Sequence, residues 1–163
     1  MTIFRCSGVL PGIVTVASLM LAGCNSDASA EAERLGRAYC RIVMAGDEAG
    51  ADALMTPALR AQIAGLRAHD ARFRADRPGD APPLDHGLRL AAYPDVPQDC
   101  DVTVEGPARV IMTYVPKGDP GAFWRDRLLL VRSGDGRLTI GDIEFGTDTR
   151  VRLRTWIKES SAG

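Results

Sequence analysis

Residues 123–145 read FWRDRLLLVR-SGDG-RLTIGDIEF, and this stretch decides the fold. Two runs rich in apolar residues, 123–132 and 138–145, flank the tetrapeptide Ser133-Gly134-Asp135-Gly136. Apolar runs separated by a short loop that contains Gly and Asp are typical of a β-hairpin. The stretch therefore predicts two antiparallel strands in the C-terminal half of the chain.

Further predicted elements lie on both sides of this hairpin. Residues 102–105 and 108–115 form two more strands around the turn Gly106-Pro107, because the second run is dense in Val, Ile, Thr and Tyr. After the hairpin, Asp148 is expected to cap a final helix that runs to about residue 159. The C-terminal half therefore reads as an antiparallel meander followed by one helix.

The N-terminal half of the mature chain is predicted to be helical. Apolar residues recur at helical spacing in 30–45, and Gly46 follows as a C-terminal cap. A shorter helix, 47–55, begins with Asp47 as N-cap. Thr56-Pro57 then starts a third helix that runs to about residue 75, since Thr at the N-cap and Pro at the first position favour a helix start.

A long irregular connection is predicted between the helices and the strands. Five prolines and two glycines punctuate residues 77–99, and Leu88-Arg89-Leu90 is the one candidate for a short edge strand in it. Long connections of this kind inside compact domains are uncommon and often functional. Helices followed by an antiparallel meander indicate an α+β fold.

Three short motifs add a resemblance to this fold class: Ala38-Tyr39-Cys40-Arg41, Thr56-Pro57-Ala58-Leu59 and Ile140-Gly141-Asp142-Ile143. They resemble a bacterial lipoprotein group with nuclear-transport-factor-2-like domains, over most of residues 30–146. The resemblance implies N-terminal helices packed on a curved, cone-like sheet, to which this chain adds a C-terminal helix. Six aromatic residues are then candidates either for a cavity lining or for ordinary core: Tyr39, Tyr93, Tyr114, Phe123, Trp124 and Phe145.

The N-terminus has the pattern of a targeting signal. Arg5 precedes an apolar stretch, 9–22, that is too short to span a bilayer comfortably. The stretch ends in Leu21-Ala22-Gly23-Cys24, which resembles the bacterial lipobox. The resemblance implies cleavage before Cys24, a diacylglycerol thioether on it, and N-acylation with a fatty acid such as palmitate. The alternative is an ordinary secretory signal cut near Ala22. Asn25 after the cysteine implies, by the sorting rule of such proteins, the periplasmic face of the outer membrane rather than the inner membrane.

The domain organisation follows from this signal. We expect a signal peptide, a lipidated tether, a single α+β domain and a short tail, with boundaries at 1–23, 24–30, 31–159 and 160–163. Two acyl chains or more hold a protein stably at a membrane.

The four cysteines divide accordingly. Cys6 leaves with the signal and Cys24 carries the lipid. Cys40 and Cys100 remain and, in an oxidising compartment, favour one disulfide. Two unpaired thiols or a redox pair are the alternatives, although no Cys-x-x-Cys occurs.

Composition excludes several function classes. The chain has 163 residues, 45% hydrophobic and 25% charged, with a net charge of −1 and 6% aromatic residues. Such a balance argues against nucleic-acid binding, which needs a basic surface. The motifs of serine hydrolases and phosphate-binding loops are missing from the sequence. Two histidines and the cysteine assignments leave no ligand set for a metal, and no cofactor is implied.

Two sets of charged residues remain as candidates. Asp142 and Glu144 lie two apart on the predicted last strand, together with Leu138 and Ile140 on one face, and form a possible acid–base pair; ion pairing with Arg109, Arg125 or Arg127 is the alternative. Arg150, Arg154 and Lys158 would form one stripe on the final helix. This stripe either binds anionic lipid headgroups or is an ordinary surface whose charges are solvated.

The functional expectation is a membrane-anchored periplasmic lipoprotein without catalytic activity. It would bind a small apolar ligand or an envelope protein. The alternative is a hydrolase or isomerase that uses Asp142 or Glu144 in a cone-shaped pocket.

Overall fold

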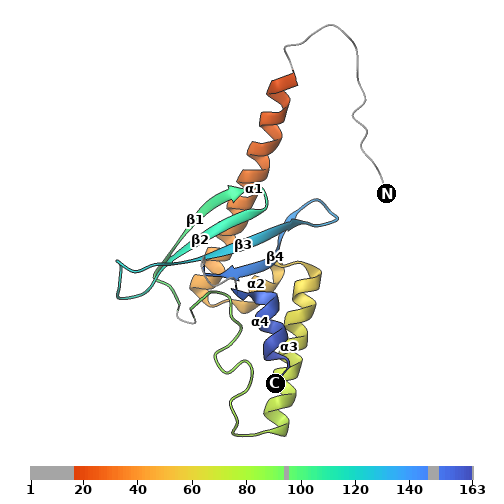
Figure 1. Ribbon diagram of the computed structural model, residues 1–163, viewed down its shortest axis with the longest axis vertical. Helices are drawn as coiled ribbons and strands as arrows, with labels where there is room; N and C mark the ends of the chain where they lie inside the picture. Colours follow the sequence, from red (N-terminus) through yellow and green to blue (C-terminus); the bar gives the residue numbers. More distant parts are fainter. Residues whose placement is uncertain (1–16, 94–95, 147–150, 163) are drawn as a thin grey trace.

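The computed structural model describes residues 17–93, 96–146 and 151–162, with side chains from residue 27 onward. It confirms the α+β class: within this part of the chain four helices accompany a five-stranded antiparallel sheet (Figure 1). The helices are α1 (Ala17–Ala45), α2 (Glu48–Leu54), α3 (Pro57–Asp76) and α4 (Leu153–Ser160). The strands are β1 (Asp99–Gly106), β2 (Arg109–Val115), β3 (Trp124–Arg132), β4 (Leu138–Phe145) and β5 (Val151–Arg152).

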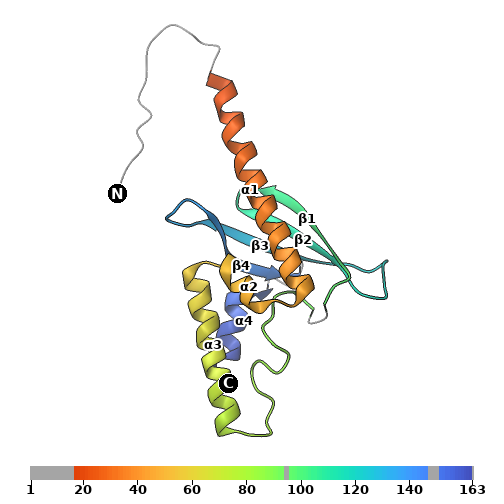
Figure 2. The same ribbon diagram turned by 180° about the vertical axis from the view of Figure 1, so that it is seen from behind.

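The sheet is an open meander in which neighbours in sequence are neighbours in space, in the order β1-β2-β3-β4-β5. Helix α1 crosses one face of this sheet, and α3 and α4 lie side by side beyond β4 (Figures 1 and 2). The N-terminal half of α1 projects past the sheet at the opposite end of the molecule from α3 and α4. The core lies between the sheet and the helices, where the inward-facing strand residues meet Tyr39, Leu59 and Ile63.

Helix α1 presents to the sheet the face that its periodicity predicts. Ala32, Gly36, Tyr39, Cys40 and Val43 are buried along one side. The helix approaches the sheet closely at Gly36, where an added Cβ would lie 2.7 Å from Val102 Cγ1 and 2.9 Å from Val110 Cγ1. The helix begins at Ala17 rather than at the expected residue 30, and residues 17–29 contain no proline that would interrupt it.

The predicted helix signals operate as expected. Gly46 takes a positive φ of 64° directly after α1. The Asp47 side chain accepts the Gly50 N–H at 2.9 Å, and Thr56 Oγ1 accepts the Leu59 N–H at 3.3 Å. A backbone bond from Thr56 N to Ile140 O, 2.9 Å, then fixes the start of α3 on β4.

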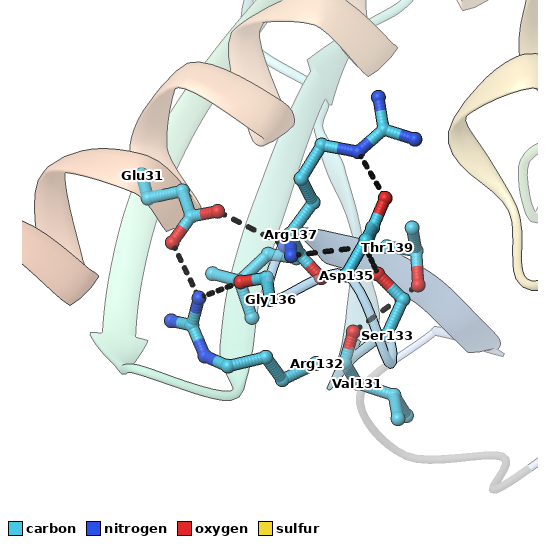
Figure 3. A network of polar contacts seen from close by, with 9 residues as sticks. Glu31, Val131, Arg132, Ser133, Asp135, Gly136, Arg137 and Thr139 are labelled. Carbon is cyan, nitrogen blue, oxygen red and sulfur yellow. Dashed lines mark hydrogen bonds and ion pairs between the residues drawn. The ribbon is translucent and has the colours of Figure 1, made fainter.

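The β3–β4 hairpin is tied to α1 by the polar network of Figure 3. Glu31 accepts the backbone N–H of Leu138 at 2.9 Å and pairs with Arg132 at 3.0 Å. These contacts lower the pKa of Glu31, the Leu138 N–H having the larger effect. Within the loop, hydrogen bonds from Ser133 and Arg137 lower the pKa of Asp135 to about 2. The helix that leads to the chain's N-terminus is therefore fastened to the sheet at Glu31.

A β-bulge corrects the predicted alternation of β4. Leu129 pairs with Asp142 and Leu130 pairs with Ile140, so Gly141 is the extra residue. A Cβ at Gly141 would lie 2.6 Å from Val131 Cγ2, which explains why glycine suits this position. The bulge reverses the faces, so Ile140 joins Ile143 in the core, on the opposite side of the sheet from Asp142 and Glu144.

Two further expectations need correction. Residues 151–152 pair with β4 as β5, so α4 begins at Leu153 and not near Asp148, which lies outside the described residues. Residues 88–90 form no strand in the structure. In both places backbone groups find partners elsewhere in the fold, which local sequence patterns do not reveal.

Candidate functional site

A pocket of about 620 Å³ opens beneath the irregular connection between α3 and β1. We call residues 77–98 the connecting segment. One wall consists of the segment itself, mostly apolar residues from Ala81 to Val96, and the opposite wall comes from α1, α2 and α4. The lining from these helices and the turn after α1 is Val43, Gly46, Glu48 and Trp156.

Three buried or half-buried carboxylates hold the connecting segment in place. Asp70 of α3 accepts the Leu84 N–H at 2.8 Å, and Glu48 of α2 accepts the Leu88 N–H at 2.9 Å. Asp126 of β3 accepts the Ala92 N–H at 2.9 Å. Backbone groups in a segment without secondary structure still need partners when they are buried. Side-chain carboxylates therefore accept the backbone N–H groups that a helix or strand would otherwise pair. They do so at every fourth residue: Leu84, Leu88 and Ala92.

Asp126 is the most deeply buried of the three, with 1% of its surface exposed. Its second oxygen accepts the Gly146 N–H at 2.8 Å, so one carboxylate joins the connecting segment to the turn after β4. Burial raises the pKa of Asp126 from 3.8 to about 6, although the two N–H donors and the charge of Arg89 act in the opposite direction. The side chain sits on the core face of β3, opposite Met112.

Two buried tyrosines lie beside this carboxylate. Tyr39 of α1 donates a hydrogen bond from its hydroxyl to the Leu90 carbonyl oxygen at 2.6 Å, which fixes the connecting segment to α1. The Tyr114 hydroxyl is buried without a hydrogen-bond partner among the described residues. Burial, together with nearby Asp126, raises the pKa of both phenols well above the usual value. Neither tyrosine therefore ionises near neutral pH.

The predicted aromatic set is divided by the structure. Tyr93 lines the pocket and packs on Trp124, with ring centroids 5.0 Å apart, and Trp124 stacks on Tyr114 at 5.3 Å. Tyr39, Tyr114 and Phe145 are core residues, while Phe123 is exposed. Arg89 covers the Phe145 ring at 4.6 Å and donates to the Ala92 carbonyl. Only Tyr93 of the six thus lines the pocket wall.

Asp142 and Glu144 occupy structural positions away from the pocket. Asp142, 7% exposed, accepts the N–H groups of Ile143 at 2.9 Å and Arg154 at 3.2 Å, and so serves the start of α4. Glu144 pairs with Arg127 at 2.9 Å and Arg152 at 2.8 Å, contacts that lower its pKa. Neither acid lines the pocket beneath the connecting segment, so the structure gives no support to an acid–base role for them there.

The other candidate residues lie apart from the pocket. Arg154 and Lys158 lie four residues apart on α4, whereas Arg150 lies outside the described residues. Cys24 falls within α1, and its side chain is outside the described part. The predicted pairing of Cys40 with Cys100 is confirmed: the Sγ atoms are at bonding distance, 1.98 Å, and the Cα atoms are 5.8 Å apart.

Sequence reasoning missed the carboxylates that build the pocket. Asp126, Glu48 and Asp70 come from different elements, and nothing local distinguishes them from other surface acids. The one feature of the sequence that pointed to them is the connecting segment, because its buried backbone N–H groups need hydrogen-bond acceptors from other parts of the fold.

The described residues contain neither a metal-binding cluster nor a helix suited to cross a membrane. Across 17–93, 96–146 and 151–162, the His, Cys, Asp and Glu side chains form no group of three or more that would hold a metal ion. None of the described helices has the length and apolar character needed to cross a membrane. The chain matches no protein-family model, and searches of curated proteins and solved structures found no similar protein.

Proposed function

We propose that this protein is a lipid-anchored binding module of the bacterial cell envelope, which takes a small, largely apolar ligand in the pocket beneath the connecting segment. The lipobox-like sequence at Cys24 supports the anchor. The bonded pair Cys40–Cys100 is consistent with an oxidising compartment. The N-terminal half of α1, which includes position 24, projects past the sheet (Figure 2), whereas the pocket is lined by Val43 near the other end of this helix.

The pocket is the observation that carries the binding function. Its volume of about 620 Å³ lies within the ordinary range for small-molecule sites. Prolines, valines, Tyr93 and Trp156 supply an apolar wall, and Glu48, Asp85, His86 and Arg89 add polar or charged groups to it. Glu48 is already engaged by the Leu88 N–H and by Arg67, so it acts as a support for the wall. The apolar part of the lining is what supports the binding of a largely apolar ligand. We also propose that the sheet is curved into a cone-like shape. The helices that cover its inner face support this arrangement.

Lipidation at Cys24 has a direct test. Mass spectrometry of the protein extracted from membranes is expected to find an acylated cysteine at the N-terminus of the mature chain. Cys24→Ser should move the protein out of the membrane fraction, because stable anchoring requires the acyl chains. Cys6→Ser is the matched control, since Cys6 leaves with the signal. Membrane association that persists in Cys24→Ser would contradict the anchor.

Ligand binding in the pocket is tested with a neutral fluorescent probe, N-phenyl-1-naphthylamine. The full chain in non-ionic detergent should bind it saturably, after subtraction of the fluorescence that the same detergent gives without protein, since this apolar dye also dissolves in micelles. Val96→Asp should weaken binding by about tenfold or more, because it places a charge in an apolar pocket wall. Val131→Asp is the control: both valines are half exposed, at 53% and 50%, but Val131 lies on β3 outside the pocket. Equal effects of the two substitutions would contradict a ligand site here.

A further inference from the structure

A second concavity, an open groove of about 740 Å³, runs between α3 and α4. Its two sides come from helix faces that meet at the buried residues Leu66 and Ile157. The α3 side carries polar and small residues at helical spacing, and the α4 side carries two cations. The lining is Gln62, Gly65, Leu66, His69, Arg72, Arg154, Thr155, Ile157, Lys158 and Ser161.

The charge of this groove is uniformly positive. Arg72, Arg154 and Lys158 line it, and no Asp or Glu does. Some arginines elsewhere are paired, such as Arg67 with Asp52, Arg74 with Asp70, and Arg127 with two glutamates. Others, such as the exposed Arg41 and Arg60, form no ion pair with a described carboxylate, so the groove differs by gathering its cations in one concavity. Among the described residues, no carboxylate lies within ion-pair distance of the three groove cations. Like charges that line one groove repel one another, and an anion bound there relieves that repulsion. Because Arg72 and Lys158 are exposed, water and salt screen part of it.

The Arg154 guanidinium is held in a fixed position. Its Nε donates to the Gly141 carbonyl at 2.9 Å, and Nη1 contacts Gln62 Oε1 at 3.4 Å. This leaves Nη2 without a partner in the described part of the chain. A guanidinium that is already oriented loses less conformational entropy when it binds an oxyanion.

Two further residues line the groove: His69, with a buried ring nitrogen, and Gly65, with free space around it. The His69 Nε2 atom is buried there without a hydrogen-bond partner among the described residues. At Gly65, an added Cβ would meet nothing within 4 Å, although glycine in a helix interior costs about 1 kcal/mol relative to alanine. The groove therefore has free space at Gly65 next to its cations, whereas the His69 ring nitrogen is enclosed by protein atoms.

We propose that the α3–α4 groove binds an oxyanion of the phosphate type. Arg72, Arg154 and Lys158 supply the charge-assisted hydrogen bonds, and the Thr155 hydroxyl supplies a neutral donor at the side of the groove. The groove lies at the opposite end of the molecule from the start of α1 (Figures 1 and 2). A soluble phosphate ester can reach this end, whereas, with Cys24 anchored as proposed above, the membrane headgroups would lie near the other end.

Calorimetric titration of the full chain in non-ionic detergent tests this site. The probes are inorganic phosphate, glycerol 3-phosphate and, for the lipid source, short-chain phosphatidylglycerol against short-chain phosphatidylcholine. Arg72→Gln/Lys158→Gln should weaken anion binding by about tenfold or more. The control, Arg41→Gln/Arg60→Gln, removes the same charge from exposed positions outside the groove and should bind as the wild type does.

Gly65→Glu provides a second variant with an intact fold. Glutamate is a better helix former than glycine, and its Cβ would meet no atom within 4 Å at this position, but its carboxylate is expected to enter the groove. Loss of phosphate binding in Gly65→Glu and in the double variant establishes the site for a soluble ester. Binding of phosphatidylglycerol alone, lost in the same variants, assigns it to a headgroup. The absence of saturable binding to any of the anions, or binding that neither variant weakens, overturns the proposal.

Discussion

Replacing Cys40 and Cys100 together by alanine is expected to lower the free energy of unfolding by about 4 kcal/mol. The bond closes a loop of 60 residues, which contains α2, α3 and the whole connecting segment. In the chain-entropy description, a cross-link over such a loop removes about this much freedom from the unfolded chain. The effect is a large part of the total stability of a small domain.

Denaturant unfolding monitored by circular dichroism measures this difference. The wild type with a reducing agent should unfold at the same midpoint as the double alanine variant, and the reducing agent should leave that variant unchanged. Single replacements, Cys40→Ala and Cys100→Ala, should each match the double variant, since either one removes the same bond. A wild type that is insensitive to reduction would contradict a stabilising role for the bond.

Asp126→Ala should be the second most damaging change, at about 2–4 kcal/mol near neutral pH. Two buried N–H groups, of Ala92 and Gly146, lose their acceptor, and each unpaired donor costs about 1–3 kcal/mol. Removing a desolvated carboxylate offsets part of this loss. Tyr114→Phe is the matched control in the same cluster: its hydroxyl is buried without a partner among the described residues, so its removal should cost nothing.

The difference between wild type and Asp126→Ala should grow in acid. Because the pKa of Asp126 is raised from 3.8 to about 6, the protonated form favours the folded state. This stabilisation is complete below the unfolded pKa and is lost as the pH rises through the folded value. Between about pH 7.5 and 3.5 the wild type should therefore gain about 3 kcal/mol that the variant lacks.

Urea titrations of the two proteins across this range give the comparison, and the difference between them isolates Asp126 from other groups. Glu31, Asp70 and Glu144 have lowered pKa values, so their stabilisation is lost as the pH falls, equally in both proteins. A difference that stays constant with pH would show that Asp126 keeps the same charge in the folded and unfolded states.

The elements of the fold were largely predictable from the sequence because their signals are local. Gly46, Asp47 and Thr56-Pro57 act through neighbouring backbone groups, so the helix boundaries that they set are correct. The 133–136 loop likewise places β3 and β4 within a residue of their observed bounds. The two remaining cysteines could be paired by elimination, without any geometry.

The features that escaped prediction depend on distant partners. The bulge at Gly141 arises where β4 meets β3 and moves Ile140 to the core face, which alternation along one strand does not reveal. Helix α4 starts late because Val151 and Arg152 pair with β4 first. The pocket depends on Asp126, whose role follows from the position of Ala92, 34 residues earlier in the chain.

The three attachments of the connecting segment also have a consequence for how this protein could be altered. Since Leu84, Leu88 and Ala92 are each fixed by a carboxylate from a different element, the spans between them are separate short loops with fixed ends. Changes to the exposed residues 85–87 should thus reshape one part of the pocket wall without disturbing its neighbours. The span 89–91 differs, because Leu90 and Ala91 belong to the core and Tyr39 holds the Leu90 carbonyl. One short loop of the wall is therefore open to exchange, while the other is part of the folding unit.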